Sequence, residues 1–231
     1  MHFLMTTLAE RFKLVREKIT LAAGRAGRSP EEIALVAVSK THPGATIREA
    51  ADETGQELFG ESRVQEAVVK IPALPGRLRW HFIGHLQSNK IRKALPLFEL
   101  FHGIDTAAIA REMDRIAGEM GLFPRVLLEV NVSGEGSKHG FAPEQLEREL
   151  DELLALSQVQ VEGFMTMAPL ATEKEHSRPY FAKLRELRDR LSDRSGIPFE
   201  TLSMGMSGDY EIAVEEGATL VRVGSALFGG R

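Results

Sequence analysis

Eight apolar segments of strand length alternate along this chain with segments whose apolar residues recur at helical spacing. The eight strand-like segments span residues 33–38, 57–60, 80–84, 100–104, 125–132, 159–167, 199–203 and 219–224. A helix-like segment separates each from the next, and strand starts lie roughly 20 to 40 residues apart, as βα units require. The pattern predicts an α/β fold, a single (β/α)8 TIM barrel. An apolar stripe over residues 4–22 predicts an extra N-terminal helix before the first strand.

A doubly wound open sheet is the alternative α/β arrangement. Such sheets usually carry a G-x-G-x-x-G turn directly after the first strand. Here that position reads Ser39-Lys40-Thr41-His42-Pro43, so a dinucleotide-binding sheet is disfavoured. The Pro- and Gly-rich connections are short enough to be ordinary loops, and no linker divides the chain. We therefore expect one domain spanning residues 1–231.

Composition excludes several classes of function. The chain has 231 residues, of which 43% are hydrophobic, and a formal net charge of −4 without a basic cluster, which argues against nucleic-acid binding. The sequence shows no apolar run of about 18 residues and no leader pattern, so we expect a cytoplasmic protein that does not bind membranes. The absence of cysteine excludes disulfides, iron–sulfur clusters, thiolate zinc sites and cysteine nucleophiles. We expect no metal site.

Lys40 is the first candidate for chemistry. It follows the apolar run at residues 33–38, and Pro43-Gly44 stops that strand. Because ligands of α/β folds bind at the C-terminal ends of the strands, a carbonyl compound would meet this amine there. A partly desolvated lysine has a lowered pKa, and its neutral form adds to an aldehyde. The ordinary alternative is a solvated lysine, as most lysines are.

Two small, hydroxyl-bearing loops follow the last two strands. One contains Ser203 and Ser207, and the other contains Gly224 and Ser225. In many barrels the loops after strands seven and eight bind phosphate through backbone amides and hydroxyls. The alternative is a glycine turn in which Ser207 or Asp209 is an ordinary helix cap.

Arg222 lies inside the apolar last strand, where an unpaired guanidinium would be costly to bury. Its acceptor is either a structural carboxylate or a ligand. An amine nucleophile, a phosphate loop and a buried arginine together suggest a phosphorylated aldehyde. Pyridoxal 5′-phosphate offers a matching group to each of the three.

Several sequence blocks, in this order and spacing, resemble the pyridoxal phosphate homeostasis proteins, also called the proline synthase co-transcribed homologues. The resemblance spans nearly the whole chain and rests on the blocks Ala37-Val38-Ser39-Lys40-Thr41, Phe59-Gly60-Glu61, Val64-Gln65-Glu66, Trp80-His81-Phe82-Ile83-Gly84, Leu86-Gln87-Ser88-Asn89-Lys90, Ser137-Lys138, Leu202-Ser203-Met204-Gly205-Met206-Ser207 and Val221-Arg222-Val223-Gly224-Ser225-Ala226-Leu227-Phe228-Gly229.

The resemblance implies a barrel like the cofactor domain of alanine racemase, with Lys40 as the Schiff-base lysine. It also implies phosphate contacts from Ser203 or Ser207 and from Gly224 and Ser225. Arg222 is then expected beside the cofactor.

The chain departs from the family pattern at a few positions. Family members commonly have Asn where this chain has Ser62, so a cofactor contact there is in doubt, and His85 replaces a proline of some relatives, which we interpret as loop variation. His81 and His85 straddle a strand and a turn, which disfavours zinc. We expect His81 to be a core histidine with a hydrogen-bond partner or a wall of the pocket. Lys138 is either solvated, which we favour, or a second amine near the pocket.

These features favour a non-catalytic protein that holds pyridoxal phosphate as a Lys40 aldimine and takes part in vitamin B6 homeostasis. Racemases of this barrel type append a β domain with a catalytic tyrosine. This sequence shows no such domain and only two tyrosines, so a paired acid–base arrangement is not evident.

The alternatives are a minimal amino-acid racemase or lyase using the same cofactor, and a Schiff-base sugar-phosphate aldolase without it. Apo forms of pyridoxal-phosphate enzymes are candidate recipients, and we expect a monomer or a weak homodimer.

Overall fold

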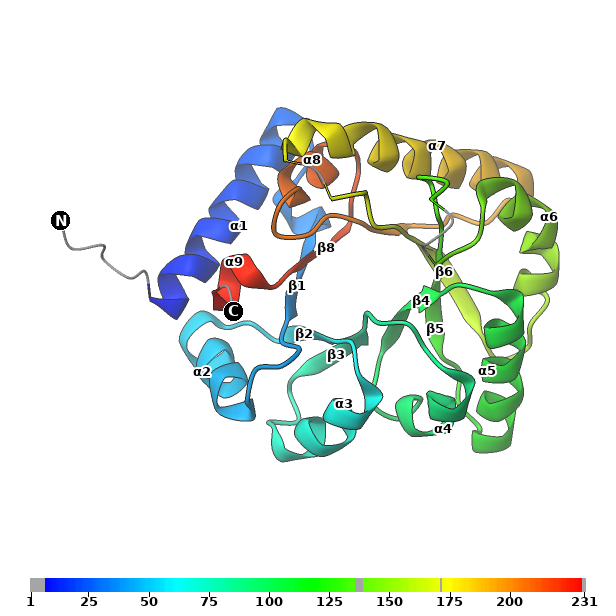
Figure 1. The fold of residues 1–231 in the computed structure, drawn as a ribbon, viewed down its shortest axis with the longest axis horizontal. Coiled ribbons are helices and arrows are strands. Elements are labelled where there is room, and N and C mark those ends of the chain that lie inside the picture. Colours follow the sequence, from blue (N-terminus) through cyan, green and yellow to red (C-terminus); the bar gives the residue numbers. More distant parts are fainter. Residues whose placement is uncertain (1–6, 136–138, 171, 230–231) are drawn as a thin grey trace.

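A closed barrel of eight parallel strands forms the centre of the molecule (Figure 1). The computed structural model describes residues 7–135, 139–170 and 172–229. The strands pair in chain order, and the last pairs with the first. They are β1 Ala34–Val38, β2 Leu58–Glu61, β3 Arg79–Phe82, β4 Leu100–Ile104, β5 Arg125–Glu129, β6 Gln160–Met165, β7 Thr201–Ser203 and β8 Leu220–Val223. The predicted TIM barrel is confirmed, and the doubly wound alternative is wrong.

Helices surround the barrel, as Figure 1 shows. They are α1 Leu8–Arg25, α2 Gly44–Thr54, α3 Val64–Lys70, α4 Ile91–Ala94, α5 Ala107–Met120, α6 Pro143–Leu154, α7 Arg178–Ser195, α8 Tyr210–Glu215 and α9 Ser225–Phe228. A 3-10 turn at Ser88–Lys90 precedes α4, which therefore begins only at Ile91. No helix among the described residues is long and apolar enough to cross a membrane.

The strands are apolar on both faces because both faces are buried. In β8, Val221 packs outward in the core shared with the helices, whereas Leu220 packs inward with Val36 and Leu127 in a smaller cluster inside the barrel. This is the usual arrangement of parallel sheets, whose strands are covered on each side. Arg222 has the same parity as Leu220 and therefore points inward with it.

The predicted strand at residues 125–132 ends early, at Glu129. Beyond it the chain meets the returning loop: Phe141 N donates to Glu129 O at 2.8 Å, and Asn131 N donates to Phe141 O at 2.9 Å. The apolar residues Val130 and Val132 are thus buried where the chain packs against this loop, beyond the end of β5.

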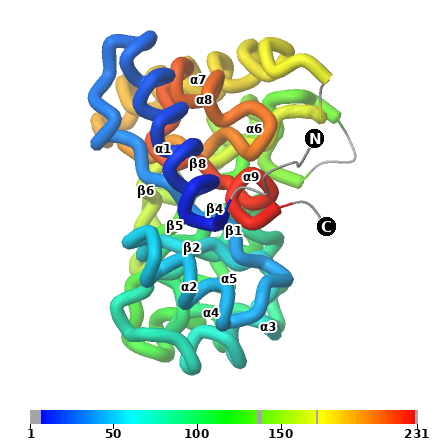
Figure 2. The backbone as a smooth tube through the Cα atoms, turned by 90° about the vertical axis from the view of Figure 1, so that its left-hand side faces the viewer, coloured from blue at the N-terminus to red at the C-terminus, as the bar shows by residue number. Residues whose placement is uncertain are grey.

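The extra N-terminal helix, α1, is confirmed. Thr7 caps it and forms a capping box with Glu10, and its buried face includes Phe12 and Ile19. The helix packs against α8, α9 and α2. Figure 2 shows α1 beside α9, outside the part of the barrel where β1 meets β8. It thereby covers the seam where the first and last strands close the barrel.

Candidate functional site

A cavity of about 430 Å³ opens at the C-terminal ends of the strands. Its walls come mainly from the loops after β1, β6, β7 and β8. Of the residues predicted from the sequence, the cavity brings together Lys40, Ser207, Arg222, Gly224 and Ser225. Side chains separated by more than 180 positions therefore meet in one space, at the end of the barrel where TIM-barrel enzymes place their sites.

Lys40 lies two residues after the end of β1 and lines the cavity. Its neighbour Ser39 is buried and donates to Glu61 Oε1 at 2.7 Å, which anchors the chain just before the lysine. Thr41 has a φ of 68°, a conformation that costs a non-glycine residue energy and is found disproportionately at functional sites. Lys40 itself is exposed, so the partial desolvation expected from its strand-end position is absent from this structure.

Two backbone amides converge on the Ser207 hydroxyl. Gly224 N donates to Ser207 Oγ at 3.2 Å, and Ala226 N donates to the same oxygen at 3.3 Å. Gly224 is also packed closely, because a Cβ at that position would lie 3.3 Å from Val38 Cβ. The two amides therefore hold the Ser207 hydroxyl at one side of the cavity, and its O–H remains available as a donor to an anionic oxygen.

Arg222 is buried and held in place by two acceptors. One guanidinium nitrogen donates to Ser203 Oγ, and the other donates to the Thr166 carbonyl oxygen at 3.0 Å. Burial lowers the pKa of Arg222 to about 10, while the carboxylates of Glu129 and Asp209 act to raise it. The side chain is therefore still a cation at neutral pH.

Ser203 does not occupy the place expected of a phosphate ligand. Its side chain is fully buried, bonded to Arg222, and outside the described lining of the cavity. The last residue of β7 shares the inward parity of Arg222, so its hydroxyl meets the guanidinium instead of a ligand. Of the alternatives Ser203 and Ser207, only Ser207 reaches the cavity, where Ser225 also lies.

Two buried histidines, His102 and His81, extend the hydrogen-bonded series that begins with Arg222 and Ser203. His102 Nδ1 lies 2.8 Å from Ser203 Oγ, and His102 Nε2 lies 2.9 Å from His81 Nδ1. Burial lowers the pKa of His81 to about 3, with the charges of Arg79 and Arg125 as smaller causes. Burial also lowers the pKa of His102 well below its ordinary value. Both rings are neutral, and His81 is the core histidine with a partner that the sequence suggested.

Sequence reasoning missed a second group of polar residues near the rim. Glu129 ends β5 and is buried, and its burial together with the Asp105 carboxylate raises its pKa to about 7. His42, Lys174 and Asp209 line the cavity, whereas Glu129 is not part of its lining. Each of these residues lies at or after a strand end, a signal that could have identified them.

The cavity lining does not include Ser62, His81 or His85, which the sequence had also singled out. Ser62 is half-buried, and its backbone lies against Gly84, where a Cβ would stand 2.9 Å from Ser62 Cα. Lys138 lies outside the described residues. His81 and His85 belong to separate clusters, since His81 pairs with His102 and His85 pairs with Asp105.

Residues 15–231 match a family model described as the alanine racemase N-terminal domain. Curated relatives agree over nearly their whole length. The pyridoxal phosphate homeostasis protein of Aquifex aeolicus is 44% identical over 223 residues, covering 96% of this chain and 97% of the relative. That of Escherichia coli K12 is 43% identical and covers 98% of each chain.

Solved structures show the same likeness. PipY of Synechococcus elongatus PCC7942 is 42% identical, covers 96% of this chain and 100% of its own, and superposes with a TM-score of 0.87 without PLP and 0.84 with PLP bound. An alanine racemase of Clostridium difficile has a TM-score of 0.74 at 18% identity, and the match covers 56% of its chain. At that identity the likeness concerns the fold alone.

Proposed function

Because this chain belongs to the pyridoxal phosphate homeostasis protein family, we propose that it binds pyridoxal 5′-phosphate in the cavity at its strand ends and holds it through Lys40. The observation that carries the proposal is the convergence of Lys40, Ser207 and Arg222 on one cavity. A PLP-bound structure of PipY, which is 42% identical, supports the choice of ligand.

The residues present fit the three polar groups of this cofactor. The hydroxyls of Ser207 and Ser225 supply donors for the phosphate, and the amides of Gly224 and Ala226 hold the Ser207 hydroxyl in place. Lys40, on the loop after β1, supplies an amine for the aldehyde. The cavity volume of about 430 Å³ falls within the range typical of small-molecule sites.

Arg222 is suited to face the pyridine nitrogen. When bound, the cofactor supplies an aldehyde carbon for an amine and a ring that withdraws electrons most strongly when its nitrogen is protonated. An arginine carries only N–H donors and cannot accept a proton. Because Ser203 and Thr166 hold the guanidinium in place, it would keep the ring nitrogen unprotonated and the ring a weak electron acceptor.

We infer that the role is storage and release of the cofactor rather than catalysis. Among the described residues, neither tyrosine lines the cavity, and burial raises the pKa of Tyr210 to about 12. A tyrosine with such a pKa exchanges protons poorly near neutral pH. Transfer of the cofactor to apo-enzymes that depend on it is the use we propose, and the same chain as a minimal racemase is the alternative.

Absorbance and chemical trapping test the binding proposal. Wild-type protein incubated with pyridoxal phosphate and dialysed should retain a visible absorbance band that borohydride bleaches, with the label mapped to Lys40. Lys40→Ala should lose the band. Lys93→Ala, at an exposed lysine on α4, is the matched control and should keep it. Wild-type protein that retained no cofactor would refute the proposal.

Exchange of the amino-acid α-proton in deuterated water separates storage from catalysis. We expect the loaded wild-type protein to exchange no faster than free pyridoxal phosphate at the same concentration. Faster exchange that disappears in Lys40→Ala would establish the racemase alternative.

A further inference from the structure

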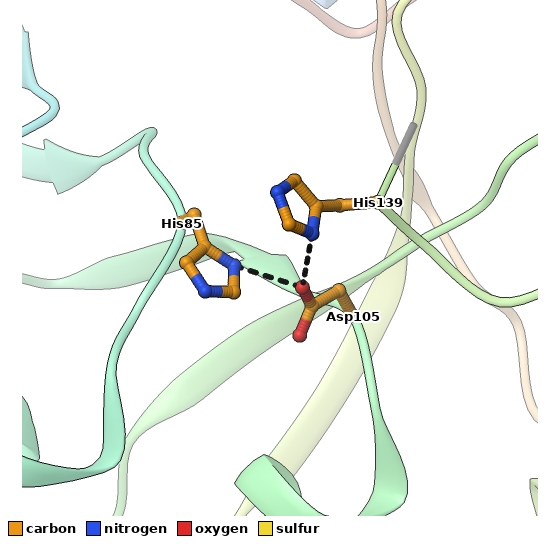
Figure 3. A group of neighbouring side chains, drawn as sticks. All are labelled: His85, Asp105 and His139. Atoms are coloured by element: carbon orange, nitrogen blue, oxygen red, sulfur yellow. Dashed lines mark hydrogen bonds and ion pairs between the residues drawn. The ribbon is translucent and has the colours of Figure 1, made fainter. Parts of the chain in front are cut away.

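Three polar side chains from three consecutive βα loops meet on the rim of the barrel (Figure 3). His85 follows β3, Asp105 follows β4 and His139 lies in the loop after β5. Asp105 Oδ2 is 2.9 Å from His85 Nδ1 and 3.5 Å from His139 Nδ1. Each residue offers one ligand atom, and these atoms all lie within 4.8 Å of one another.

The buried carboxylate of Asp105 is only partly satisfied. Its side chain is 4% exposed, and Oδ1 has no hydrogen-bond partner among the described residues. Thr106, and not Asp105, caps α5, since Thr106 Oγ1 accepts from Ile109 N at 3.3 Å. The carboxylate is therefore not used by the helix, and a buried carboxylate oxygen without a partner is costly.

The two imidazoles enclose the carboxylate from the solvent side. The side chains of His85 and His139 are 44% and 63% exposed, and their rings stack with centroids 4.4 Å apart. Gly84, the residue before His85, lies directly against the backbone of Ser62, where a Cβ would stand 2.3 Å from Ser62 O. An ion from solution would enter between the two Nδ1 atoms and Asp105 Oδ2, in place of the hydrogen bond that now joins His85 to Asp105.

We propose that His85, Asp105 and His139 bind one divalent ion of the zinc class, with water completing the coordination. Zinc bonds of about 2.0–2.2 Å in a tetrahedral site separate neighbouring ligand atoms by about 3.3 Å. The observed separations of 2.9 and 3.5 Å lie on either side of that value. Two imidazoles and one carboxylate favour zinc and similar transition metals over magnesium or calcium, which prefer oxygen ligands.

This site is separate from the proposed cofactor site. None of its three residues belongs to the lining of the cavity, whose walls come mainly from the loops after β1, β6, β7 and β8. Along the chain His85 is spaced with His81, a pairing that disfavours zinc, whereas its partners in the structure come from the next two loops. The metal proposal stands whether or not the chain binds pyridoxal phosphate.

The direct test titrates untagged, chelator-treated protein with Zn²⁺ by calorimetry and counts retained zinc by elemental analysis after dialysis. We expect one ion per chain. His85→Ala and His139→Ala should each weaken binding at least tenfold, and Asp105→Asn should do the same. His176→Ala, at an exposed histidine 3.7 Å from Glu173 and outside the cluster, is the matched control and should bind as the wild type does.

Circular dichroism and pyridoxal phosphate loading of each variant show whether the barrel is intact. Because His85 and His139 are partly exposed, both alanine variants should fold and load the cofactor as the wild type does. Retention of no zinc by the wild type, or equal affinity in the wild type and His139→Ala, would overturn the proposal. If the wild type bound zinc but no cofactor, only the proposed function would fail.

Discussion

At the scale of single residues, Ser203 and Ser207 have different roles, although the sequence offered both as alternative phosphate ligands. Ser203 is buried and bonded to Arg222 and His102. Ser207 lines the cavity and accepts hydrogen bonds from two backbone amides. One hydroxyl holds the arginine in place. The other is available to a ligand.

Alanine substitutions should separate these tasks. Ser203→Ala leaves donors and acceptors of two buried side chains unpaired, so we expect the free energy of unfolding to fall by about 1–3 kcal/mol. Ser207→Ala removes the acceptor of the part-buried Gly224 and Ala226 amides, which cavity water can replace, so we expect a smaller fall of about 0.5–1 kcal/mol. It should also weaken retention of pyridoxal phosphate about tenfold through the loss of one hydrogen bond to a charged group. Urea unfolding and absorbance titration measure the two effects. Equal destabilisation by both variants would contradict this division.

At the scale of elements, β6 and β7 approach each other so closely that glycine is required between them. A Cβ at Gly163 would lie 2.8 Å from the carbonyl carbon of Thr201 and still nearer to its oxygen. Both atoms belong to the backbone of the neighbouring strand, which cannot move without opening the barrel. The glycine is thus a condition for closing the sheet.

Gly163→Ala should therefore destabilise the barrel by about 3 kcal/mol or more, a range reached only by severe backbone or packing conflicts. Gly118→Ala in α5 is the matched control, since its Cβ would meet only Gln158 Cγ, at 3.7 Å. Alanine is favoured over glycine in a helix by about 1 kcal/mol, so this variant should be neutral or more stable. Urea unfolding of both variants measures the difference. Similar midpoints would show that the strands can separate without cost.

At the scale of the whole molecule, the buried histidines link global stability to pH. The folded protein keeps His81 neutral, with a pKa lowered to about 3, whereas the unfolded chain takes up a proton near pH 6.5. Below pH 6.5 the unfolded state therefore binds more protons, and stability falls as the pH drops. Glu129 acts in the opposite sense between about pH 7 and 4.5, because the folded state holds its proton. A single variant is needed to isolate the histidine.

His81→Gln removes this contribution. The stability advantage of the wild type over the variant should shrink by about 2 kcal/mol between pH 7 and pH 5, as the shift of one group predicts. Urea unfolding of cofactor-free protein at the two pH values measures it. His176→Gln, at an exposed histidine, should keep a constant difference from the wild type. A pH-independent difference for His81→Gln would mean that burial does not hold this ring neutral.

The sequence by itself determined the barrel, the added helix α1 and five of the residues that line the cavity. Strand and helix periodicities are local properties of the chain, and the rule that parallel strands end on one rim converts them into positions. That reasoning predicted that Lys40 and Arg222 would share a site with the loop after β8, and they line the same cavity.

Only the tertiary structure decided which polar groups contact one another across the barrel. His102 and Ser203 are 101 residues apart, and His139 reaches Asp105 from the next loop. Strand parity indicates that a side chain points inward, but the partner it meets depends on strand order, register and the paths of the loops. For this reason Ser203 accepts a hydrogen bond from Arg222, the Lys40 side chain is exposed, and His85 pairs with Asp105 instead of His81.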